Sequence, residues 1–396
     1  MTHKWKRLLA PGAAITAAAV LAACSSSSSS SSSAPAAASS SAAASTGGGD
    51  TTGLSKAQQM VSQFESVTTT YPVPTAPIKG VASLKGKTVY YIPLVAAIPG
   101  FVVTAATMKV ALADAGLKLQ VCDPQGQPSG LASCVQQATT ANAAGIVTDA
   151  VPYAMAQNAF DAAKSKGVPI IITDQIPPSA STQNTNQVTY VPGVVNQPTQ
   201  IAWWMIADSQ GKANAVIAQE SDSPSSIAYV QQALPIFKQN CAGCTYTVKS
   251  ITATTNNQLA SDTSANLLAN PNATYYYTEF EDSLDATVQG IQQANKSSSI
   301  KLSVAGGSVD GLGRLAGGSG PVKAVVAVDQ AFAGWALTDE ILRMATKSGP
   351  VTATFPSRLF TAQNIGTVKV SAAEQASGAW FGDTSYQAAF KTLWGV

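Results

Sequence analysis

The sequence has almost no histidine. Its one histidine, His3, lies in a segment that we expect to be removed on export. Histidine is the commonest general base and a common ligand of transition metals. Without it, the mature chain cannot form Ser-His-Asp or Cys-His catalytic arrangements. We therefore expect a protein that is not an enzyme and that needs neither a metal nor a cofactor.

Charged residues are also scarce. They make up 11% of the chain, against about 25% in an average protein. The formal net charge of +2 would become −1 once Lys4, Lys6 and Arg7 were lost with the leader. There is thus no basic surface to attract nucleic acid, and we expect no nucleic-acid partner.

The first residues have the pattern of an export signal. Three basic residues precede an apolar run from Leu8 to Ala23, which is short for a membrane span of about 20 residues. This pattern predicts a signal peptide over residues 1–23. The end of the run, Leu21–Cys24, resembles a bacterial lipobox and implies a lipid on Cys24, which would anchor the chain to the extracytoplasmic face of the cell membrane. The alternative is an ordinary signal peptide followed by a coincidental cysteine.

Two further segments precede the main domain. Residues 24–53 are mostly Ser, Ala and Gly, with unbroken serine from Ser25 to Ser33, and we expect a disordered tether there. Residues 54–82 combine a predicted amphipathic helix with a proline-rich connector. The remaining chain is too long for one comfortable hydrophobic core, which favours two lobes.

Four cysteines follow Cys24, and an even number in an exported chain indicates disulfides. Proximity in the sequence favours Cys122–Cys134 and Cys241–Cys244, although three pairings are formally possible. Cys241 and Cys244 also have the CxxC spacing of redox and zinc sites. They lie in a helix-to-strand loop, whereas a thioredoxin-type CxxC opens a helix, so a structural staple is the preferred interpretation.

Short apolar, β-branched runs alternate with helical patterns along the main domain. The first four strands begin about 23 to 30 residues apart, as parallel βαβ units require. The expected strands are 87–93, 117–121, 145–149, 168–173, 187–192, 213–218, 245–251, 273–278, 300–305 and 322–328. The pattern predicts an α/β protein with two lobes in series, each built on its own parallel sheet.

Several stretches, taken in order, resemble the ribose- and galactose-binding proteins of ABC importers, a type I periplasmic-binding-protein family. The most specific is Gly167–Asp174, reading Gly-Val-Pro-Ile-Ile-Ile-Thr-Asp. The others are Ile98–Phe101, Gly145–Asp149, Glu279–Asp282 and Val325–Gly334.

This resemblance implies two Rossmann-like lobes joined by a hinge of three crossovers, near 191–196, 326–330 and 357–362. Lobe 1 would comprise 83–192 and 328–358, and lobe 2 would comprise 193–327 and 359–396. Ligand would bind between the lobes at the carboxyl ends of the strands.

The family's binding positions can be carried over one at a time. Phe101 would stack on a sugar ring, and Asp174 would accept hydrogen bonds from ligand hydroxyls. Gln175 stands where an arginine is common, Glu279 where the family has Asn, and Gly307 where it has Asp. Further candidates for ligand contact are Tyr153, Asp222, Phe280 and Asp329.

These changes remove arginine from the expected site and add carboxylates. They leave several ligands open: a different polyol, an amino sugar, a cationic solute, or a weakly polar solute stacked on aromatic rings.

The resemblance implies a monomeric lipoprotein that passes a sugar-like solute to an ABC permease. A ligand sensor that presents the solute to a membrane receptor or kinase is the alternative. A secreted hydrolase using Glu279 and Glu281 is a third hypothesis. The glycine-rich stretch from Gly306 to Gly318 lacks the GxxxxGK[ST] phosphate loop, which disfavours nucleotide binding.

Overall fold

The computed structural model describes residues 48–252 and 257–396. The expected signal peptide, the lipidation site at Cys24 and the tether as far as residue 47 lie outside the described residues. Within the described ranges, no helix is long and apolar enough to cross a membrane.

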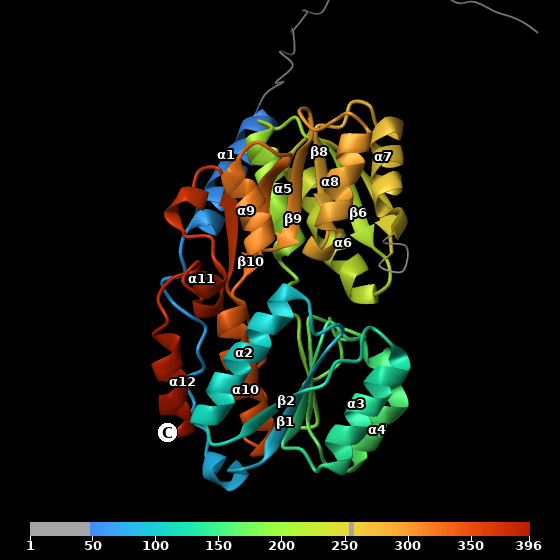
Figure 1. The fold of residues 1–396 in the computed structure, drawn as a ribbon. Helices are drawn as coiled ribbons and strands as arrows, with labels where there is room; N and C mark the ends of the chain where they lie inside the picture. Colours follow the sequence, from blue (N-terminus) through green and yellow to red (C-terminus); the bar gives the residue numbers. More distant parts are fainter. Residues whose placement is uncertain (1–47, 253–256) are drawn as a thin grey trace, which may run out of the picture. The chain divides into compact units, whose positions relative to one another are not determined.

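The first lobe is built on a five-stranded parallel sheet (Figure 1) with the strand order β2-β1-β3-β4-β5. Its strands are β1 (Thr88–Pro93), β2 (Lys118–Val121), β3 (Gly145–Asp149), β4 (Ile170–Thr173) and β5 (Val188–Val191). β3 and β4 are buried along their whole length, because helices cover both faces of the sheet.

Alternate strand residues face opposite helix layers in this lobe. Val89, Tyr91 and Val147 pack against α2 (Pro99–Asp114) and α10 (Gln330–Ala345). Ile92, Ile146 and Ile172 pack against α3 (Pro128–Thr140) and α4 (Gln157–Ser165). Two short 3-10 helices, η1 (Val81–Leu84) and η2 (Tyr153–Ala156), complete the lobe.

The second lobe has a six-stranded sheet with the order β11-β10-β9-β8-β6-β7, in which only β11 is antiparallel to its neighbour. Its strands are β6 (Asn214–Glu220), β7 (Thr245–Ile251), β8 (Tyr275–Thr278), β9 (Lys301–Gly306), β10 (Val322–Val328) and β11 (Ser357–Thr361). Both sheets are therefore dominated by parallel strands, and the expected fold class is confirmed.

Two helix layers enclose this second sheet. One layer contains α1 (Gly48–Glu65), α5 (Gln197–Asp208) and α6 (Pro224–Asn240). The opposite layer contains α7 (Leu259–Ala269), α8 (Leu284–Gln293) and α9 (Val309–Gly317). The remaining helices are η4 (Glu281–Ser283), η5 (Ile365–Thr367), α11 (Ala372–Ser377) and α12 (Tyr386–Trp394).

The chain passes between the lobes at three crossovers, of which the first two lie where the resemblance implied and the third lies earlier in the chain. They lie between β5 and α5, between β10 and α10, and between α10 and β11. The third crossover occupies 346–356, because residues 357–361 already form β11 in the second sheet.

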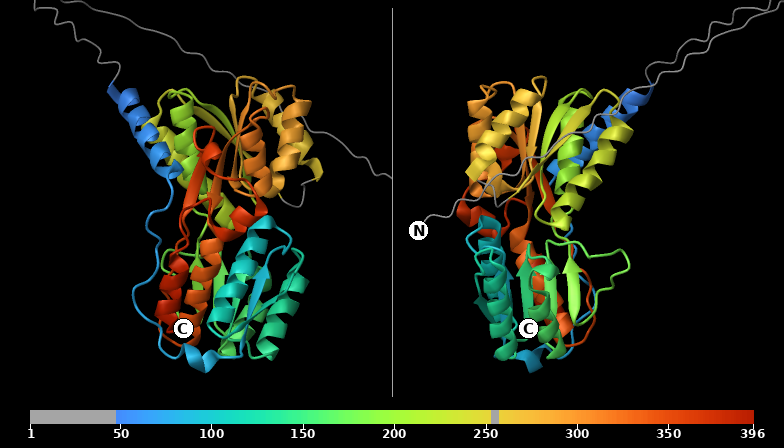
Figure 2. Two further views of the ribbon diagram at one scale, coloured as in Figure 1. Left: turned by 60° about the vertical axis from the view of Figure 1, so that its left-hand side comes forward. Right: turned by 90° about the vertical axis from the view of Figure 1, so that its right-hand side faces the viewer.

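Two additional segments run between the lobes (Figure 2). After α1, the connector reaches the first lobe, where the Ile78 amide donates to the Leu393 carbonyl oxygen at 2.8 Å. The C-terminal segment runs beside it, and the Thr68 amide donates to the Phe381 carbonyl oxygen at 2.6 Å. Five segments thus link the lobes where the resemblance implied three.

The last helix lies in the first lobe, although we expected 359–396 to lie in the second. Trp394 of α12 stacks on Trp335 of α10 with the ring centroids 5.6 Å apart. Its indole Nε1 also donates to Asp339 Oδ1 at 2.8 Å. This aromatic packing places α12 in the core of the first lobe, while Trp380 and Phe381 remain in the core of the second.

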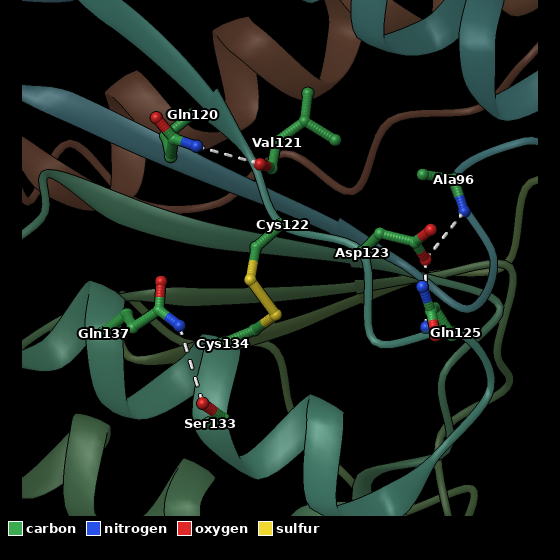
Figure 3. The surroundings of a disulfide bond; sticks show 9 residues. All are labelled: Ala96, Gln120, Val121, Cys122, Asp123, Gln125, Ser133, Cys134 and Gln137. Carbon is green, nitrogen blue, oxygen red and sulfur yellow. Dashed lines mark hydrogen bonds between the residues drawn. A yellow bond between two sulfur atoms is a disulfide. The ribbon is translucent and has the colours of Figure 1, made fainter.

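Both disulfides expected from proximity are present. Cys122–Cys134 joins the end of β2 to α3 (Figure 3), and Asp123 next to it accepts hydrogen bonds from the amides of Ala96 and Gln125. Cys241–Cys244 closes the loop between α6 and β7.

One local prediction is wrong, and one helix was not predicted. The disordered tether was expected to reach residue 53, but α1 begins at Gly48, and Gly53 packs against the Asn240 carbonyl oxygen at the end of α6. The glycine-rich stretch also contains a helix, α9. Glu281 fixes the start of this helix by accepting hydrogen bonds from the amides of Ser308 and Gly311 at 2.7 and 2.8 Å.

Candidate functional site

Four acidic residues stand at or directly after the carboxyl ends of buried strands. Asp149 ends β3 and Asp174 follows β4 in the first lobe. Glu220 ends β6 and Glu279 follows β8 in the second lobe. Neighbouring parallel strands end at the same edge of a sheet, so each lobe presents a pair of carboxyl groups at that edge.

Asp149 and Asp174 form the pair in the first lobe. Their side chains are only 2% and 8% exposed, and the Tyr91 hydroxyl donates to Asp149 Oδ2 at 2.6 Å. Burial raises the pKa of Asp149, and burial together with the neighbouring Asp149 carboxyl raises the pKa of Asp174 well above its usual range. Two ionised carboxylates cannot hydrogen-bond to each other, so the pair is satisfied only when one of them carries a proton.

Glu220 and Glu279 form the pair in the second lobe. The Glu220 amide donates to Glu279 Oε2 at 2.7 Å. Burial, with repulsion from Asp282 and Asp222, raises the pKa of Glu220 to about 8. Burial also raises the pKa of Glu279 to about 9, although this backbone hydrogen bond acts in the opposite direction.

Tyr229 on α6 brings the two pairs into one group. Its side chain is 2% exposed, and burial followed by the charges of Asp174, Glu279 and Asp149 raises the pKa of its hydroxyl. The tyrosine of the second lobe therefore lies within the electrostatic reach of carboxyls from both lobes. We refer to Tyr91, Asp149, Asp174, Glu220, Tyr229 and Glu279 as the interlobe cluster.

Four buried polar atoms of the interlobe cluster have no hydrogen-bond partner among the described residues. They are Asp149 Oδ1, Asp174 Oδ1, Tyr229 Oη and Glu279 Oε1. An unpaired buried polar group costs about 1–3 kcal/mol, and native proteins leave few of them. Four such atoms therefore gather where the two lobes meet.

Direct hydrogen bonds join the lobes beside this cluster. Gln175 Oε1 accepts from the hydroxyls of Ser225 and Ser223 at 2.9 and 3.2 Å, and the Ile176 amide donates to Ser225 Oγ at 3.0 Å. The cluster is therefore covered in this conformation. A ligand can reach it only when the lobes separate and break these bonds.

Arginine side chains could pair with the carboxyl groups of the interlobe cluster, but the arginines of the described residues lie elsewhere. Arg314 pairs with Asp285 and Asp310 on the surface, and Arg343 pairs with Asp339 in the first lobe. Arg358 donates to the carbonyl oxygens of Glu65 and Trp380. The three arginines within the described ranges thus have structural partners outside the interlobe cluster.

No arrangement of three or more acidic, histidine or cysteine side chains in residues 48–252 and 257–396 could hold a metal ion.

Comparison of the sequence with protein-family models and with curated proteins found no match. Solved structures do match. A 5-methylthioribose transporter solute-binding protein from Thermotoga lettingae aligns with a TM-score of 0.65 and 14% identity, over 80% of this chain and 99% of that one. The fold is that of the type I periplasmic binding proteins.

Two other solved structures agree with this assignment. A sugar ABC transporter protein from Yersinia enterocolitica aligns with a TM-score of 0.64 and 18% identity, over 82% of this chain and 98% of that one. The Caulobacter myo-inositol binding protein, bound to myo-inositol, aligns with a TM-score of 0.61 and 17% identity, over 75% and 98%. The first two of these three solved neighbours are named as transporter proteins, and the third is named as a binding protein for myo-inositol.

In a type I periplasmic-binding fold, the carboxyl edges of the two sheets face each other, and three of the predicted site residues lie there. Asp174 and Glu279 belong to the interlobe cluster, and Gln175 forms the bridge to α6. Asp222 is exposed but contributes to the raised pKa of Glu220, which places it near the cluster.

Other predicted site residues have structural partners. Phe101 is 8% exposed in the core of the first lobe. The Tyr153 hydroxyl donates to Asp161 at 2.8 Å, and Phe280 is half-buried just before η4. Asp329 caps α10 by accepting from the Phe332 amide at 2.9 Å, and it also accepts from the Tyr71 hydroxyl at 3.4 Å.

Gly307 has a backbone role. Its φ is 79°, and a Cβ there would lie 2.1 Å from the Cβ of Ala327. Only glycine fits this turn between β9 and α9.

The sequence-based site omitted four members of the interlobe cluster: Tyr91, Asp149, Glu220 and Tyr229. Two of them carried a usable signal, because Asp149 ends the predicted strand 145–149 and Glu220 comes two residues after the predicted strand 213–218. Tyr229 lies inside a helix pattern, where sequence alone does not separate a core position from one that faces the other lobe.

Proposed function

We propose that this chain is an extracytoplasmic lipoprotein that captures a sugar-like solute between its two lobes and delivers it to an ABC importer. The observation that carries the proposal is the set of unpartnered buried polar atoms contributed by both lobes. The fold supports it, since solved neighbours with this fold are named for 5-methylthioribose and myo-inositol. Lipidation at Cys24 would hold the chain beside a permease.

The mechanism follows from the hinge. In the open state, the carboxyl groups of both sheets meet water, and a solute can replace that water on one lobe. Closure then forms the bond between Gln175 and Ser225 and brings Tyr229 and Glu279 onto the solute. Closing excludes water, which strengthens each polar contact made to the ligand.

A thermal-shift screen of the full exported chain tests this function. The panel holds pentoses, hexoses, polyols, amino sugars, amines and purine nucleosides. A ligand at a thousandfold excess over its Kd stabilises the native state by about 4 kcal/mol, which is a shift of several degrees. We expect a shift from one class of sugar or polyol.

The variant Asp174→Asn serves as the site control. Asparagine tolerates the φ of 56° at this position, so the fold is kept while one carboxylate is lost. We expect the ligand-induced shift to fall in this variant. Protein that is folded and ligand-free, yet unshifted by every compound, would contradict the proposal. For a compound that binds, loss of its uptake by cells lacking the chain distinguishes transport from sensing.

A further inference from the structure

The interlobe cluster carries an unusual balance of charge for a site that would hold a neutral sugar. It contains four carboxyl groups, and Asp222 and Asp282 lie close enough to Glu220 to raise its pKa. None of the ion pairs found in the described ranges includes one of the four carboxyl groups of the cluster. A ligand that closes this site therefore meets carboxyl groups whose ionised form is not balanced by an ion pair within the protein.

The unpartnered atoms are also nearly all acceptors. Three are carboxylate oxygens, on Asp149, Asp174 and Glu279, and the fourth is the Tyr229 hydroxyl, which can accept as well as donate. A neutral hydroxyl supplies one donor and no charge. A protonated amine supplies three donors, has no acceptor and carries a positive charge. The amine therefore matches both the hydrogen bonding and the charge of the cluster.

Burial makes this difference large. An isolated buried carboxylate is strongly destabilising, and an opposite charge at hydrogen-bonding distance offsets much of that effect. A neutral polyol would leave the Asp149 and Asp174 pair dependent on a shared proton. A protonated amine between them and Glu279 takes the place of that proton.

We infer that the solute captured by this protein is a polyhydroxylated molecule bearing a protonated amine, whose ammonium is held by Asp149, Asp174 and Glu279 beside Tyr229. This inference rests on the proposed function and names the class of its ligand. Hydroxyl groups elsewhere on the solute would bind the remaining polar groups along the two sheet edges.

One consequence is a release of protons. Glu220 and Glu279 hold protons at neutral pH because burial raises their pKa values to about 8 and 9. Burial also raises the pKa of Asp149, to about 6, and that of Asp174. The hydroxyls of Tyr91, Tyr229 and Tyr277, which also face them, stay protonated because their pKa values are raised too. Since the amine arrives already charged, its binding should expel protons from the carboxyls, and affinity should rise as the pH rises from 5.5 to 7.

Isothermal titration calorimetry on the full exported chain tests the inference with matched pairs of ligands. The two compounds of a pair have the same carbon skeleton, and one of them carries an amine in place of a hydroxyl group. The pairs are glucose with glucosamine, galactose with galactosamine, mannose with mannosamine, and sorbitol with glucamine. At pH 7 we expect the amine to bind at least tenfold more tightly than its neutral partner in the best-binding pair. Titration in buffers of different ionisation enthalpy should show net proton release for the amine.

Two variants assign the preference to the cluster. Asp174→Asn and Glu279→Gln remove one carboxylate each with little change in shape, and each should reduce the amine-to-neutral ratio by several-fold. Asp285→Asn is the matched control, because the Asp285 side chain is 83% exposed and pairs with Arg314 on the surface. The control should keep the ratio of the unaltered protein.

The outcomes separate this inference from the function on which it rests. Equal or tighter binding of the neutral partner in the best-binding pair, or no release of protons with the amine, overturns the inference and leaves solute capture standing. An amine preference that survives both variants also overturns it. If no compound of any pair binds, the proposed function is wrong for this class of solute, and the inference is wrong as well.

Discussion

Asp174 is held in a left-handed backbone conformation, with a φ of 56°. Residues other than glycine adopt this conformation at a cost of about 1–3 kcal/mol, and such residues gather at functional sites. At this position, the backbone turns the carboxyl toward Gly193 at the first crossover and toward its neighbour Asp149. A single residue thus combines backbone strain, burial and repulsion between like charges.

Two tyrosines of the interlobe cluster permit a matched test of which hydroxyls serve the fold and which serve the ligand. The Tyr91 hydroxyl donates to Asp149 at 2.6 Å, whereas the Tyr229 hydroxyl is buried without a partner. Tyr91→Phe should therefore lower the stability of the ligand-free protein by about 1–3 kcal/mol. Tyr229→Phe should leave that stability unchanged or raise it slightly, because it removes an unpaired polar group.

Thermal denaturation of both variants, with and without ligand, measures these effects. Tyr229→Phe should reduce the stabilisation that a bound ligand provides, since the ligand loses one contact. The assignment of Tyr229 to ligand binding would be wrong if its phenylalanine variant destabilised the ligand-free protein as strongly as Tyr91→Phe does.

At the scale of elements, the first crossover depends on a glycine between β5 and α5. A Cβ on Gly193 would lie 2.3 Å from the ring of Phe355 and 2.7 Å from Asp174 Oδ1. Gly193→Ala should force the third crossover, which carries Phe355, away from the first. Overpacking of this kind costs about 1–3 kcal/mol, so we expect a lower melting temperature and weaker ligand binding.

Gly313 provides the control for this substitution. It lies within α9, is exposed, and has open space where a Cβ would be. Gly313→Ala should stabilise the protein by up to about 1 kcal/mol, because alanine favours the helix and restricts the unfolded chain. If both variants shifted the melting temperature in the same direction, the close packing at the crossover would not be the cause.

The elements that sequence predicts best are those with a strong, continuous pattern. The strands Gly145–Asp149 and Val322–Val328 have the predicted bounds. Helix α9 was missed because three glycines interrupt its pattern. What fixes its start is Glu281, which lies some thirty residues earlier in the chain and is brought close only by the fold.

For the whole molecule, the sequence predicts the lobes better than the site between them. The resemblance to the ribose- and galactose-binding proteins identified Asp174 and Glu279. Which of these side chains meet depends on how the two lobes close, and these two residues are more than 100 positions apart in the sequence. The same limit explains why α12 was assigned to the wrong lobe. Its apolar pattern shows that the helix is buried, but the pattern does not show in which lobe.

The buried carboxyls also predict how the stability of the whole ligand-free protein depends on pH. Glu220 and Glu279 have pKa values of about 8 and 9 in the folded protein, against about 4.3 for glutamate in an unfolded chain. Between these values, the folded protein binds more protons than the unfolded chain. The free energy of unfolding therefore falls as the pH rises, and this contribution is present in full only below about pH 4.

We expect the melting temperature of the ligand-free protein to fall by several degrees between pH 5 and pH 9. The groups that face these two glutamates, Asp222, Asp282 and Tyr229 among them, supply no positive charge to oppose the effect. Glu279→Gln should flatten the profile, since glutamine does not titrate, whereas Asp285→Asn should not change it. A melting temperature that rose from pH 5 to pH 9 would contradict this prediction. It would mean that positive groups of the protein balance the carboxyl groups of the cluster. The closed lobes would then not need a bound amine to stabilise them.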